Sequence, residues 1–597
     1  MELTALDWSL IVGFFAISLG IGLAFKKRAG SSYLEYFASG RSMVWWVAGT
    51  SMVATTFAAD TPLAVTELVA KNGLAGNWFW WAWAFGGMLT VFVFSKLWRR
   101  AEVLTDVELI EQRYAGRPAA FLRGFRAVYV AVIVNSIVIG WVTQAMVKVL
   151  RHTVFTELPA DSAIDFWLVA ALLVVTGIYS VLSGMWGVAI TDVLQFVIAM
   201  IGCVIFAVVA VDHVGGIDAL REKATTGIEG GSQLFDFLPD FGAEPAWMPL
   251  GVFLALVLGQ WWATWYPGNE PGGGGYVVQR MASCKDERHA VKATLLYQLA
   301  HYCVRPWPWI LVAFAAMVMH PELRTATDPG VGYPMLIREL APSGLRGLLL
   351  VTFFAAFMST ISTQMNWGAS YLVNDVYRRF VRKDATDAQL VRTSRLASAL
   401  VLVLGGATAW LMIVRGVTVK DAWALLASLG AGVGSVFILR WLWWRINAWS
   451  EIVAMTASVG VFLGVKAWQE SLPKLEQMRE EYTSLLVAST TLVLWLLATF
   501  ATRPEPMAKL SEFYRRIRPD GPGWGPVARA TPEVRPDGTL GASLLCALLG
   551  TAAIWATLPG IGAVIFGEWL KAVLCLGGAA AAIAILLAML PRLQPRA

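Results

Sequence analysis

Four hydroxyl residues lie close together in a long apolar segment, residues 347–377, that the sequence predicts to be a helix: Ser359, Thr360, Ser362 and Thr363. At 100° per residue, three of them share one helix face with Ala356, Ser362 lies beside that face, and the two pairs are one turn, about 5 Å, apart. Hydroxyls and unpaired backbone carbonyls can bind a hard cation such as sodium without adding net charge. A lone Ser or Thr would more simply bond to its own helix or help helices pack, but the paired arrangement favours a buried ligand.

A second polar stretch interrupts an earlier apolar segment. From Gly49 to Pro62 the chain places small and polar residues, one acid and a proline at membrane depth. Backbone unwinds inside a membrane only where it lines a cavity. Unwinding here would free carbonyls such as those of Ala54 and Phe57, which could then turn toward an ion. The alternative is a proline kink that serves packing alone.

Three ionisable side chains are candidates for substrate contact. Asp60, with Thr61 beside it, lies in the interrupted segment and could bind a cationic group, accept a proton, or cap the following half-helix. His301 and Arg305 lie together in a later apolar segment. Arg305 could hold a substrate carboxylate, or it could pair structurally with Asp60 or Glu270.

Apolar stretches long enough to cross a bilayer recur along almost the whole chain. Of the 597 residues 57% are hydrophobic and 15% are charged, and the mean hydropathy is +0.60, which excludes a soluble globular protein. We predict fifteen spans, give or take one: 6–25, 44–69, 78–98, 127–150, 164–184, 187–212, 247–267, 289–319, 345–377, 393–414, 419–441, 448–468, 483–502, 541–559 and 563–590.

Basic residues gather in the connections that follow odd-numbered spans. Examples are residues 26–28, 99–100, 280–288 and 378–383, whereas the loop 320–344 carries fewer of them. The positive-inside rule then places the amino terminus outside and the carboxyl terminus in the cytoplasm. The formal net charge of +6 is explained by cytoplasmic loops beside anionic lipid, and it needs no nucleic-acid partner.

The sequence carries no recognised catalytic motif. It has no His-Glu-x-x-His, no Walker loop and no Gly-x-Ser-x-Gly, and its five histidines do not cluster at metal-ligand spacing. We therefore expect no enzyme, such as an integral membrane transferase, and no organic cofactor. The five cysteines include no pairable outer set, and the absence of an Asn-x-Ser/Thr sequon weakly favours a bacterial source. These features indicate a multi-pass plasma-membrane protein, in a bacterium one of the inner membrane.

A second helix-breaking stretch, from Gln260 to Gly268, follows the first by five spans and includes Trp262, another candidate for substrate contact. Two interrupted spans at corresponding positions of five-span units indicate an inverted-repeat transporter with its site near the midplane. We predict an all-α polytopic protein with three parts: a leading helix and loop at 1–43, a ten-helix transport core at 44–443, and trailing helices at 444–597 that include a basic loop at 503–540.

Over roughly residues 34–445 the chain resembles the sodium/solute symporter family, which shares the leucine-transporter fold. The matching segments are EYFASGRS (35–42), YSVLSG (179–184), TDVLQ (191–195), Gln279-Arg280, AFMSTISTQ (356–364) and NDVY (374–377). The resemblance implies a 5+5 inverted repeat with one leading and about four trailing helices. It also implies a sodium site made of the carbonyls of Ala54, Phe57 and Ala356 with the hydroxyls of Ser359 and Thr360.

Some members of that family hold a second sodium ion, and Asp192, Ser362 and Thr363 match the residues that bind it. Asp192 could instead be a cytoplasmic entry or release residue, close enough to the end of its span for solvent to reach it. His301 falls where sugar-transporting relatives place a polar substrate contact. The third span, in contrast, lacks the carboxylate that those relatives tend to carry.

We therefore expect a sodium-coupled secondary active symporter that imports a small polar organic solute by alternating access. The resemblance makes two sodium ions per substrate plausible and slightly favours a sugar or polyol. An amino acid or a carboxylate is the alternative substrate, and a sensor that keeps the transporter fold is an alternative function. The expected partners are sodium, the solute and the lipid bilayer, and the sequence says nothing about oligomeric state.

Overall fold

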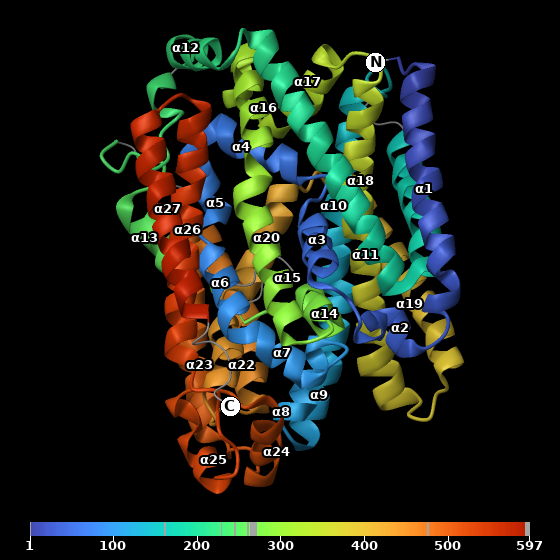
Figure 1. The fold of residues 1–597 in the computed structure, drawn as a ribbon, viewed down its shortest axis with the longest axis vertical. Helices are drawn as coiled ribbons and strands as arrows, with labels where there is room; N and C mark the ends of the chain where they lie inside the picture. Colours follow the sequence, from blue (N-terminus) through green and yellow to red (C-terminus); the bar gives the residue numbers. More distant parts are fainter. Residues whose placement is uncertain are drawn as a thin grey trace.

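The computed structural model of the chain is a bundle of helices (Figure 1). It describes residues 2–159, 163–228, 230–243, 246–259, 262, 272–473 and 477–590. Within these residues every named element is a helix, and the one extended pairing is an isolated bridge between Met43 and Cys284. The predicted all-α class is confirmed.

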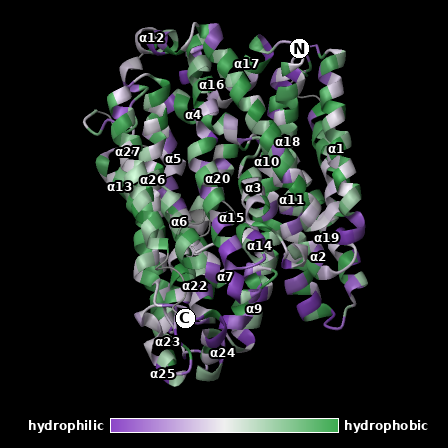
Figure 2. Cartoon of the chain, viewed as in Figure 1, coloured by the Kyte–Doolittle hydropathy of each residue, from purple (hydrophilic) through white to green (hydrophobic). Residues whose placement is uncertain are grey.

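Twelve stretches of the described residues are long and apolar enough to cross a bilayer: Ala5–Ala29, Leu74–Ala101, Gly116–Thr153, Ile164–Val181, Ser183–Val214, Glu287–Met319, Leu345–Val381, Asp387–Arg415, Ala448–Glu470, Tyr482–Ala501, Leu540–Ile565 and Trp569–Met589. Hydrophobic residues cover the middle of the bundle, and many hydrophilic residues gather at its lower end as drawn in Figure 2. This banding is what a membrane-spanning bundle requires.

The crossings that the twelve omit are built from pairs of shorter helices: α3 (Trp45–Thr56) with α4 (Thr61–Asn72), α13 (Leu250–Leu258) with α14 (Gly275–Ser283), and α20 (Val419–Gly430) with α21 (Gly434–Leu442). The first pair lies at the second predicted span and the third pair at the eleventh, and α13 lies within the seventh, 247–267. The twelve long stretches coincide with the other twelve predicted spans.

Several long crossings contain a π-helical turn, a feature that often marks functional sites. Those turns are η3 (Thr90–Phe94), η5 (Tyr129–Val134), η8 (Ala300–Val304) and η11 (Tyr371–Val381). The α-helices that they join are α6 (Ala84–Leu89), α7 (Ser95–Ala101), α9 (Gly116–Val128), α10 (Asn135–Thr153), α15 (Glu287–Leu299), α16 (Pro306–Met319) and α18 (Leu345–Ser370). The short elements η2 (Leu74–Asn77) and α5 (Trp78–Trp81) precede α6.

The fifth and sixth predicted spans are two crossings that meet without an intervening loop. They share the label α11 (Ile164–Val214), and the helical backbone between them is broken at Gly184. Gly184 has φ 55°, and a Cβ atom there would lie 2.8 Å from the Cβ of Ala29. Glycine is thus required both by the backbone conformation and by the close approach of α1 (Ala5–Ala29). The break at Gly184 reverses the chain without a loop.

The helices around the two polar segments pack as two groups. Helices α14 and α15 contact each other and both contact α3 and α7; these four helices form what we call the α3 group. Helices α10, α18 and α19 (Asp387–Arg415) contact one another, and α9 packs on η11; these form the α18 group. Helix α11 packs against both α3 and α18. The interrupted helix and the hydroxyl-bearing helix therefore face each other across the boundary between the groups.

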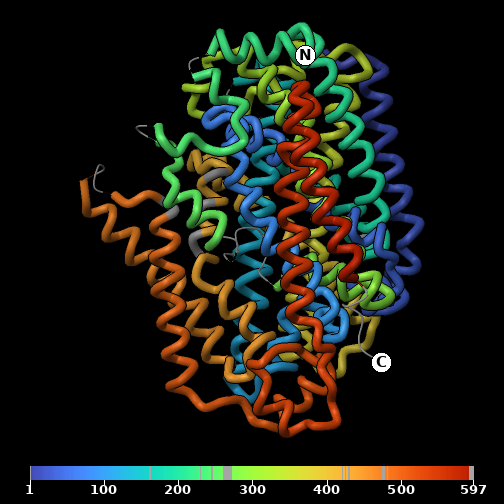
Figure 3. The backbone as a smooth tube through the Cα atoms, turned by 60° about the vertical axis from the view of Figure 1, so that its left-hand side comes forward, coloured from blue at the N-terminus to red at the C-terminus, as the bar shows by residue number. Residues whose placement is uncertain are grey.

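The trailing helices form two hairpins on different parts of the core. The hairpin of α26 (Leu540–Ile565) and α27 (Trp569–Met589) packs on α6 and η3, whereas α22 (Ala448–Glu470) with α23 (Glu480–Ala501) packs on α9 and α20. Figure 3 shows the first pair in red and the second in orange at the side of the molecule.

Short helices complete the two ends of the bundle. The lower end in Figure 1 carries α24 (Met507–Ile517), α25 (Gly525–Ala530) and, with η1 (Ser39–Arg41), α2 (Tyr33–Ala38). Near the same end are η4 (Asp106–Glu108), α8 (Leu109–Arg113) and η13 (Pro522–Trp524). The opposite end carries the amino terminus, α12 (Ile217–Gly227) and α17 (Gly332–Leu340), while η6 (Gly231–Gln233), η9 (Pro321–Arg324) and η10 (Pro329–Val331) are single turns in the connections.

Candidate cation sites and substrate cavity

The predicted break in the second crossing is present between α3 and α4. Helix α3 ends at Thr56, Phe57 has the non-helical angles φ −93° and ψ 76°, and α4 begins at Thr61. Pro62 lies in the first turn of α4, where its missing N–H group costs nothing. Asp60 occupies the N-cap position, but its side chain makes no capping hydrogen bond, so that proposed role is wrong in this structure.

The hydroxyls of Ser359 and Thr360 point at the end of α3. Ser359 Oγ lies 3.0 Å from the Ala54 carbonyl oxygen and 3.0 Å from that of Ala356. Thr360 Oγ1 lies 2.9 Å from the Thr55 carbonyl oxygen and 3.2 Å from that of Ala356. These five oxygen atoms, which we call the first cluster, come from residues that are all buried and uncharged. Such a set can hold an alkali cation at no cost in buried net charge.

The sequence placed the Phe57 carbonyl in this cluster and omitted that of Thr55. In the structure the Phe57 ring packs edge to face on Trp309, at 4.8 Å between centroids. No donor among the described residues contacts the Phe57 carbonyl oxygen, which lies beyond the last turn of α3. The Thr55 carbonyl is hydrogen-bonded to a hydroxyl of α18, and no such contact is present for the Phe57 carbonyl among the described residues.

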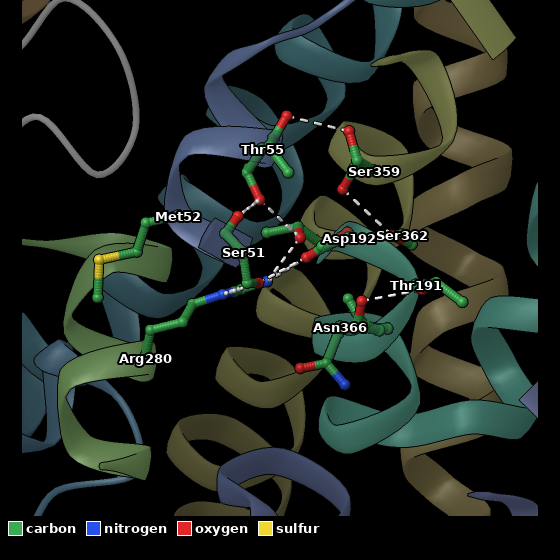
Figure 4. A network of polar contacts seen from close by, with 12 residues as sticks. Ser51, Met52, Thr55, Thr191, Asp192, Arg280, Ser359, Ser362 and Asn366 are labelled. Carbon is green, nitrogen blue, oxygen red and sulfur yellow. Dashed lines mark hydrogen bonds and ion pairs between the residues drawn. The ribbon is translucent and has the colours of Figure 1, made fainter. Parts of the chain in front are cut away.

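A second polar cluster lies nearby and contains charges (Figure 4). Asp192 on α11 accepts a hydrogen bond of 2.6 Å from Ser51 on α3. The guanidinium of Arg280 on α14 donates to Thr363 Oγ1 at 2.6 Å and to Ser51 Oγ at 3.1 Å, and it lies 3.6 Å from Asp192 Oδ2. The Thr55 hydroxyl is 3.0 Å from that of Thr363. Arg280 therefore completes an ion pair where the sequence suggested a second sodium ion.

The three residues proposed for the second sodium do not all converge. Asp192 and Thr363 both contact the Arg280 side chain, but Ser362 Oγ donates to the Ser359 carbonyl at 3.2 Å. Asp192 is fully buried, which corrects the expectation that solvent could reach it. Its Oδ1 atom has no hydrogen-bond partner among the described residues, so the carboxylate retains an acceptor position that a ligand could use.

A small cavity begins at the α3–α4 break and has a volume of about 40 Å³. Asp60, Thr61, His301 and Arg305, four of the candidates for substrate contact, line it together with Trp80 and Trp423. The Asp60 carboxylate is buried, and its Oδ1 atom has no hydrogen-bond partner among the described residues. The cavity thus combines an acceptor, a cation and two aromatic faces.

Thr56 connects this cavity to the end of α3, and the sequence did not single it out. Arg305 Nη1 donates to Thr56 Oγ1 at 3.2 Å, and Arg305 Nη2 lies 2.5 Å from His301 Nδ1. The Arg305 guanidinium also stands 5.4 Å from the ring centroid of Trp309. Thr56 directly follows Thr55, whose carbonyl belongs to the first cluster. One peptide unit therefore separates an oxygen of the first cluster from a side chain that contacts Arg305.

The cavity extends along α4, through Ala64 and Leu68, toward the end of the molecule that carries the amino terminus. In the opposite direction the two helix groups are joined by side-chain contacts. Gln279 Nε2 donates to Asn366 Oδ1 at 2.9 Å, and the Arg280 interactions lie beside it. The path toward the lower end in Figure 1, which carries the basic residues of α7 and α24 and which we call the basic end, is therefore closed in this conformation.

Most of the second predicted helix break cannot be compared with the structure. Residues 260–261 and 263–271, including Glu270, lie outside the described residues. Trp262 is described and half-buried, but it is not among the residues that line the cavity. Its predicted contact with substrate remains a prediction.

Residues 36–458 match the sequence profile of the Sodium:solute symporter family. The chain belongs to that family. It is therefore a sodium-coupled solute symporter and not an enzyme.

Three relatives illustrate the likeness in sequence. The Sodium/mannose cotransporter SLC5A10 of Bos taurus is 24% identical over 495 residues, covering 77% of this chain and 78% of the relative. The Sodium/glucose cotransporter 1 of Oryctolagus cuniculus is 27% identical over 481 residues, covering 74% and 69%. The Sodium/glucose cotransporter of Vibrio parahaemolyticus is 23% identical over 513 residues, covering 82% and 91%.

A solved structure shows the same fold. The substrate-bound outward-open state of a Na⁺-coupled sialic acid symporter superposes with a TM-score of 0.67 at 17% identity, covering 85% of this chain and 100% of the other. This likeness confirms the predicted leucine-transporter-type fold of the symporter.

Proposed function

We propose that this symporter imports a sugar or polyol and that sodium binds in the first cluster. The observation that carries the proposal is the convergence of the Ser359 and Thr360 hydroxyls on the freed carbonyls of α3. Each hydroxyl now donates its proton to a carbonyl, and rotation about its C–O bond would turn a lone pair toward an ion instead. Sodium would therefore need little backbone movement to bind, and the Phe57 carbonyl supplies a further ligand.

We propose a second sodium ion at Asp192 and Thr363. It binds in a state in which the Arg280 guanidinium has withdrawn from the Thr363 hydroxyl, because a donated N–H occupies the lone pair that sodium would use. The free acceptor position on Asp192 Oδ1 supports this assignment. Ser362 would have to turn from the Ser359 carbonyl to join the site.

We propose that the basic end of the molecule faces the cytoplasm of the cell and that the amino terminus is outside. The cavity then opens toward the outside while the inner path is closed, which is an outward-facing arrangement. Sodium at the first cluster would hold α3 against α18 and fix Thr56, which in turn positions Arg305 for substrate. An inside-negative potential adds about 2.3 kcal/mol per coupled charge per 100 mV, or about 4.6 kcal/mol for two ions.

The chemistry of the cavity suits a polyhydroxylated substrate. Asp60 can accept hydrogen bonds from hydroxyls, Arg305 can donate to them, and the indoles of Trp80 and Trp423 can pack on the apolar face of a sugar ring. The glucose and mannose named for the relatives support the same class. At about 40 Å³ the cavity is smaller than the roughly 300–1,000 Å³ of ligand sites. It must therefore widen when substrate enters.

A zwitterionic amino acid is the second candidate substrate. The observation that favours it is the presence of one carboxylate, Asp60, and one guanidinium, Arg305, in the same cavity. Such a pair could bind an ammonium and a carboxylate group of one ligand.

Uptake into proteoliposomes tests the proposal. We would measure accumulation of radiolabelled hexoses, polyols, amino acids and dicarboxylates with an inward sodium gradient, and with potassium replacing all sodium. We expect accumulation of a sugar or polyol that requires sodium. Equal accumulation in potassium would contradict sodium binding at the first cluster, and sodium-driven uptake of amino acids alone would replace the proposed substrate class with the second candidate.

A further inference from the structure

Residues 503–539, which we call the cap, fold against the basic end of the bundle (Figure 1). The cap contains α24, η13 and α25, and its own side chains pack as a unit. The rings of Phe513 and Trp524 stack at 5.6 Å between centroids, and the guanidinium of Arg113, from α8, lies 4.9 Å from the Trp524 ring. A loop that served only to connect α23 to α26 would need no such packing.

The cap is joined to the α3 group by buried ion pairs. Asp537 Oδ2 accepts hydrogen bonds from Arg100 Nη2 at 2.7 Å and from Lys96 Nζ at 3.1 Å, both on α7. Arg100 also forms a two-bond pair with Glu287 at the start of α15, at 2.9 and 3.0 Å. The side chains of Asp537 and Arg100 are only 2% and 5% exposed. Loss of Asp537 would remove the carboxylate that Arg100 and Lys96 share and leave them with Glu287 and Asp520 as their remaining acidic partners.

The charges around Asp537 favour its ionised form. Burial alone would raise the pKa of the Asp537 carboxyl, but the hydrogen bonds and charges of Arg100 and Lys96 hold that pKa below its ordinary value. Asp520 supports the same site from within the cap, because it accepts hydrogen bonds from the backbone N–H groups of Gly538 and Thr539. The position of the carboxylate is thus fixed from both sides.

The same cap is joined to helices outside the α3 group. Glu505 accepts the backbone N–H of Ala115, just before α9, at 2.8 Å and that of Ala448, at the start of α22, at 3.2 Å. The Trp524 indole N–H donates to the Trp441 carbonyl, near the end of α21, at 2.8 Å. Helix α9 packs with the α18 group through η11. One short segment therefore holds members of both helix groups.

We propose that the cap is a latch that keeps the inner gate closed, and that the Asp537 contacts with α7 must break before the α3 group can separate from the α18 group at this end. Opening of this end requires the two groups to move apart around the sodium site. Because the cap is attached to both groups, opening must break some of its contacts. The free energy of those contacts therefore opposes opening. This inference rests on the proposed function in that it takes the basic end to be the cytoplasmic gate.

The test compares how fast a thiol between the two groups becomes accessible. Asn366→Cys places a thiol on α18 where the side chain contacts Gln279 of α14, a position buried while the gate is closed. Full-length protein in lipid nanodiscs would be treated with a maleimide in saturating sodium, and modification of the peptide containing position 366 would be followed by mass spectrometry. The Asn366→Cys protein is compared with the same protein carrying Asp537→Asn.

We expect Asp537→Asn to increase the modification rate several-fold. The matched control is Glu533→Gln, which removes an exposed ion pair of 2.8 Å between Glu533 and Arg515 in the same cap without touching the core. We expect the control to leave the rate unchanged. An unchanged rate in folded Asp537→Asn protein would overturn the latch, and so would an equal increase in the control.

A second variant addresses the case in which Asp537→Asn does not fold. Glu505→Gln weakens the attachment on the other side of the cap, and we expect it to increase the modification rate as well. No increase in that variant would overturn the proposal. The labelling needs neither substrate nor a sodium gradient. A latch effect in a protein without sodium-driven uptake would therefore leave the latch standing and contradict the proposed function alone.

Discussion

The two polar clusters lie one helical turn apart along α18, yet they differ in charge. The first is made of carbonyl and hydroxyl oxygens of Ala54, Thr55, Ala356, Ser359 and Thr360, without any ionisable side chain. The second combines Asp192 with Arg280. A neutral set of oxygens can bind a small cation without losing an existing ion pair. In the second cluster the Arg280 guanidinium must first move away from Asp192 before another cation can bind there.

This difference assigns different roles to the two clusters. Under the proposed function, the first cluster binds sodium while the inner path is closed, because only hydroxyl rotation is required. The second holds α3, α11, α14 and α18 together through Arg280, so that cation binding there competes with an existing contact between the helix groups. We expect the first to set sodium affinity and the second to link a second ion to the closed gate.

The largest effect is expected from Arg280→Gln. The substitution leaves the buried Asp192 carboxylate without its counter-ion, which should lower the free energy of unfolding in sodium-free buffer by about 3–5 kcal/mol. Sodium should restore part of the lost free energy of unfolding by binding beside Asp192, where the Arg280 guanidinium lay. Thermal unfolding in sodium and in choline measures both effects.

A loss of stability that sodium does not reduce would show that the second cluster has no affinity for the ion. The matched control for the lost positive charge is Lys285→Gln, at an exposed position just beyond the end of α14. We expect that control to unfold like the unaltered protein in either salt.

Ser359→Ala combined with Thr360→Ala should have the next largest effect. The double variant removes both hydroxyl ligands from the first cluster and should raise the sodium concentration for half-maximal uptake roughly tenfold, which corresponds to about 1.4 kcal/mol. Initial rates in proteoliposomes over a range of sodium concentrations provide the measurement. Ser370→Ala removes a hydroxyl of the same helix that bonds only locally, to the Trp367 carbonyl, and is expected to have no effect.

The sequence predicted the first cluster better than the second, for physical reasons. Ser359 and Thr360 share a face because the helical period requires it, and a broken helix must expose carbonyls near Ala54. Which carbonyl meets Thr360 depends on where α3 ends, and the hydroxyl meets the carbonyl of Thr55, which the sequence did not single out. Helix ends are set by local competition between backbone and side-chain hydrogen bonds, so sequence patterns do not predict the last residue of a helix to within one position.

The ion pair of Arg280 with Asp192 is a contact between distant segments, which sequence patterns do not predict. The pair Gln279-Arg280 was recognised as a motif, but its contact with Asp192 joins residues far apart in the chain. Only the packing of α14 against α3 and of α3 against α11 brings the two charges together. The contact of Thr56 with Arg305 was missed for the same reason, since a threonine in a helix usually bonds to its own backbone.

Thr56→Val tests whether the contact between Thr56 and Arg305 affects substrate binding in the cavity independently of sodium binding at the first cluster. Valine keeps the shape of the side chain but cannot accept the hydrogen bond from Arg305, and we expect the KM for substrate to rise about fivefold, or about 1 kcal/mol. Because Thr56 contributes no oxygen to either cluster, sodium binding measured without substrate should not change. A change in sodium binding together with an unchanged KM would contradict the separation of the two roles.

Asp192→Asn also leaves Arg280 without its counter-ion and should lower stability; in protein that remains folded we expect the smallest effect on uptake rate but a decisive one on stoichiometry. The amide can still accept the hydrogen bond from Ser51, while it loses the charge that a second sodium ion would need. The sodium-to-substrate ratio, obtained from the membrane potential at which net flux is zero, is therefore expected to fall from about two to about one. If the unaltered protein already couples one ion, or if the variant retains the original ratio, the second cluster acts only as an ion pair between helices. The first cluster alone would then couple sodium to transport.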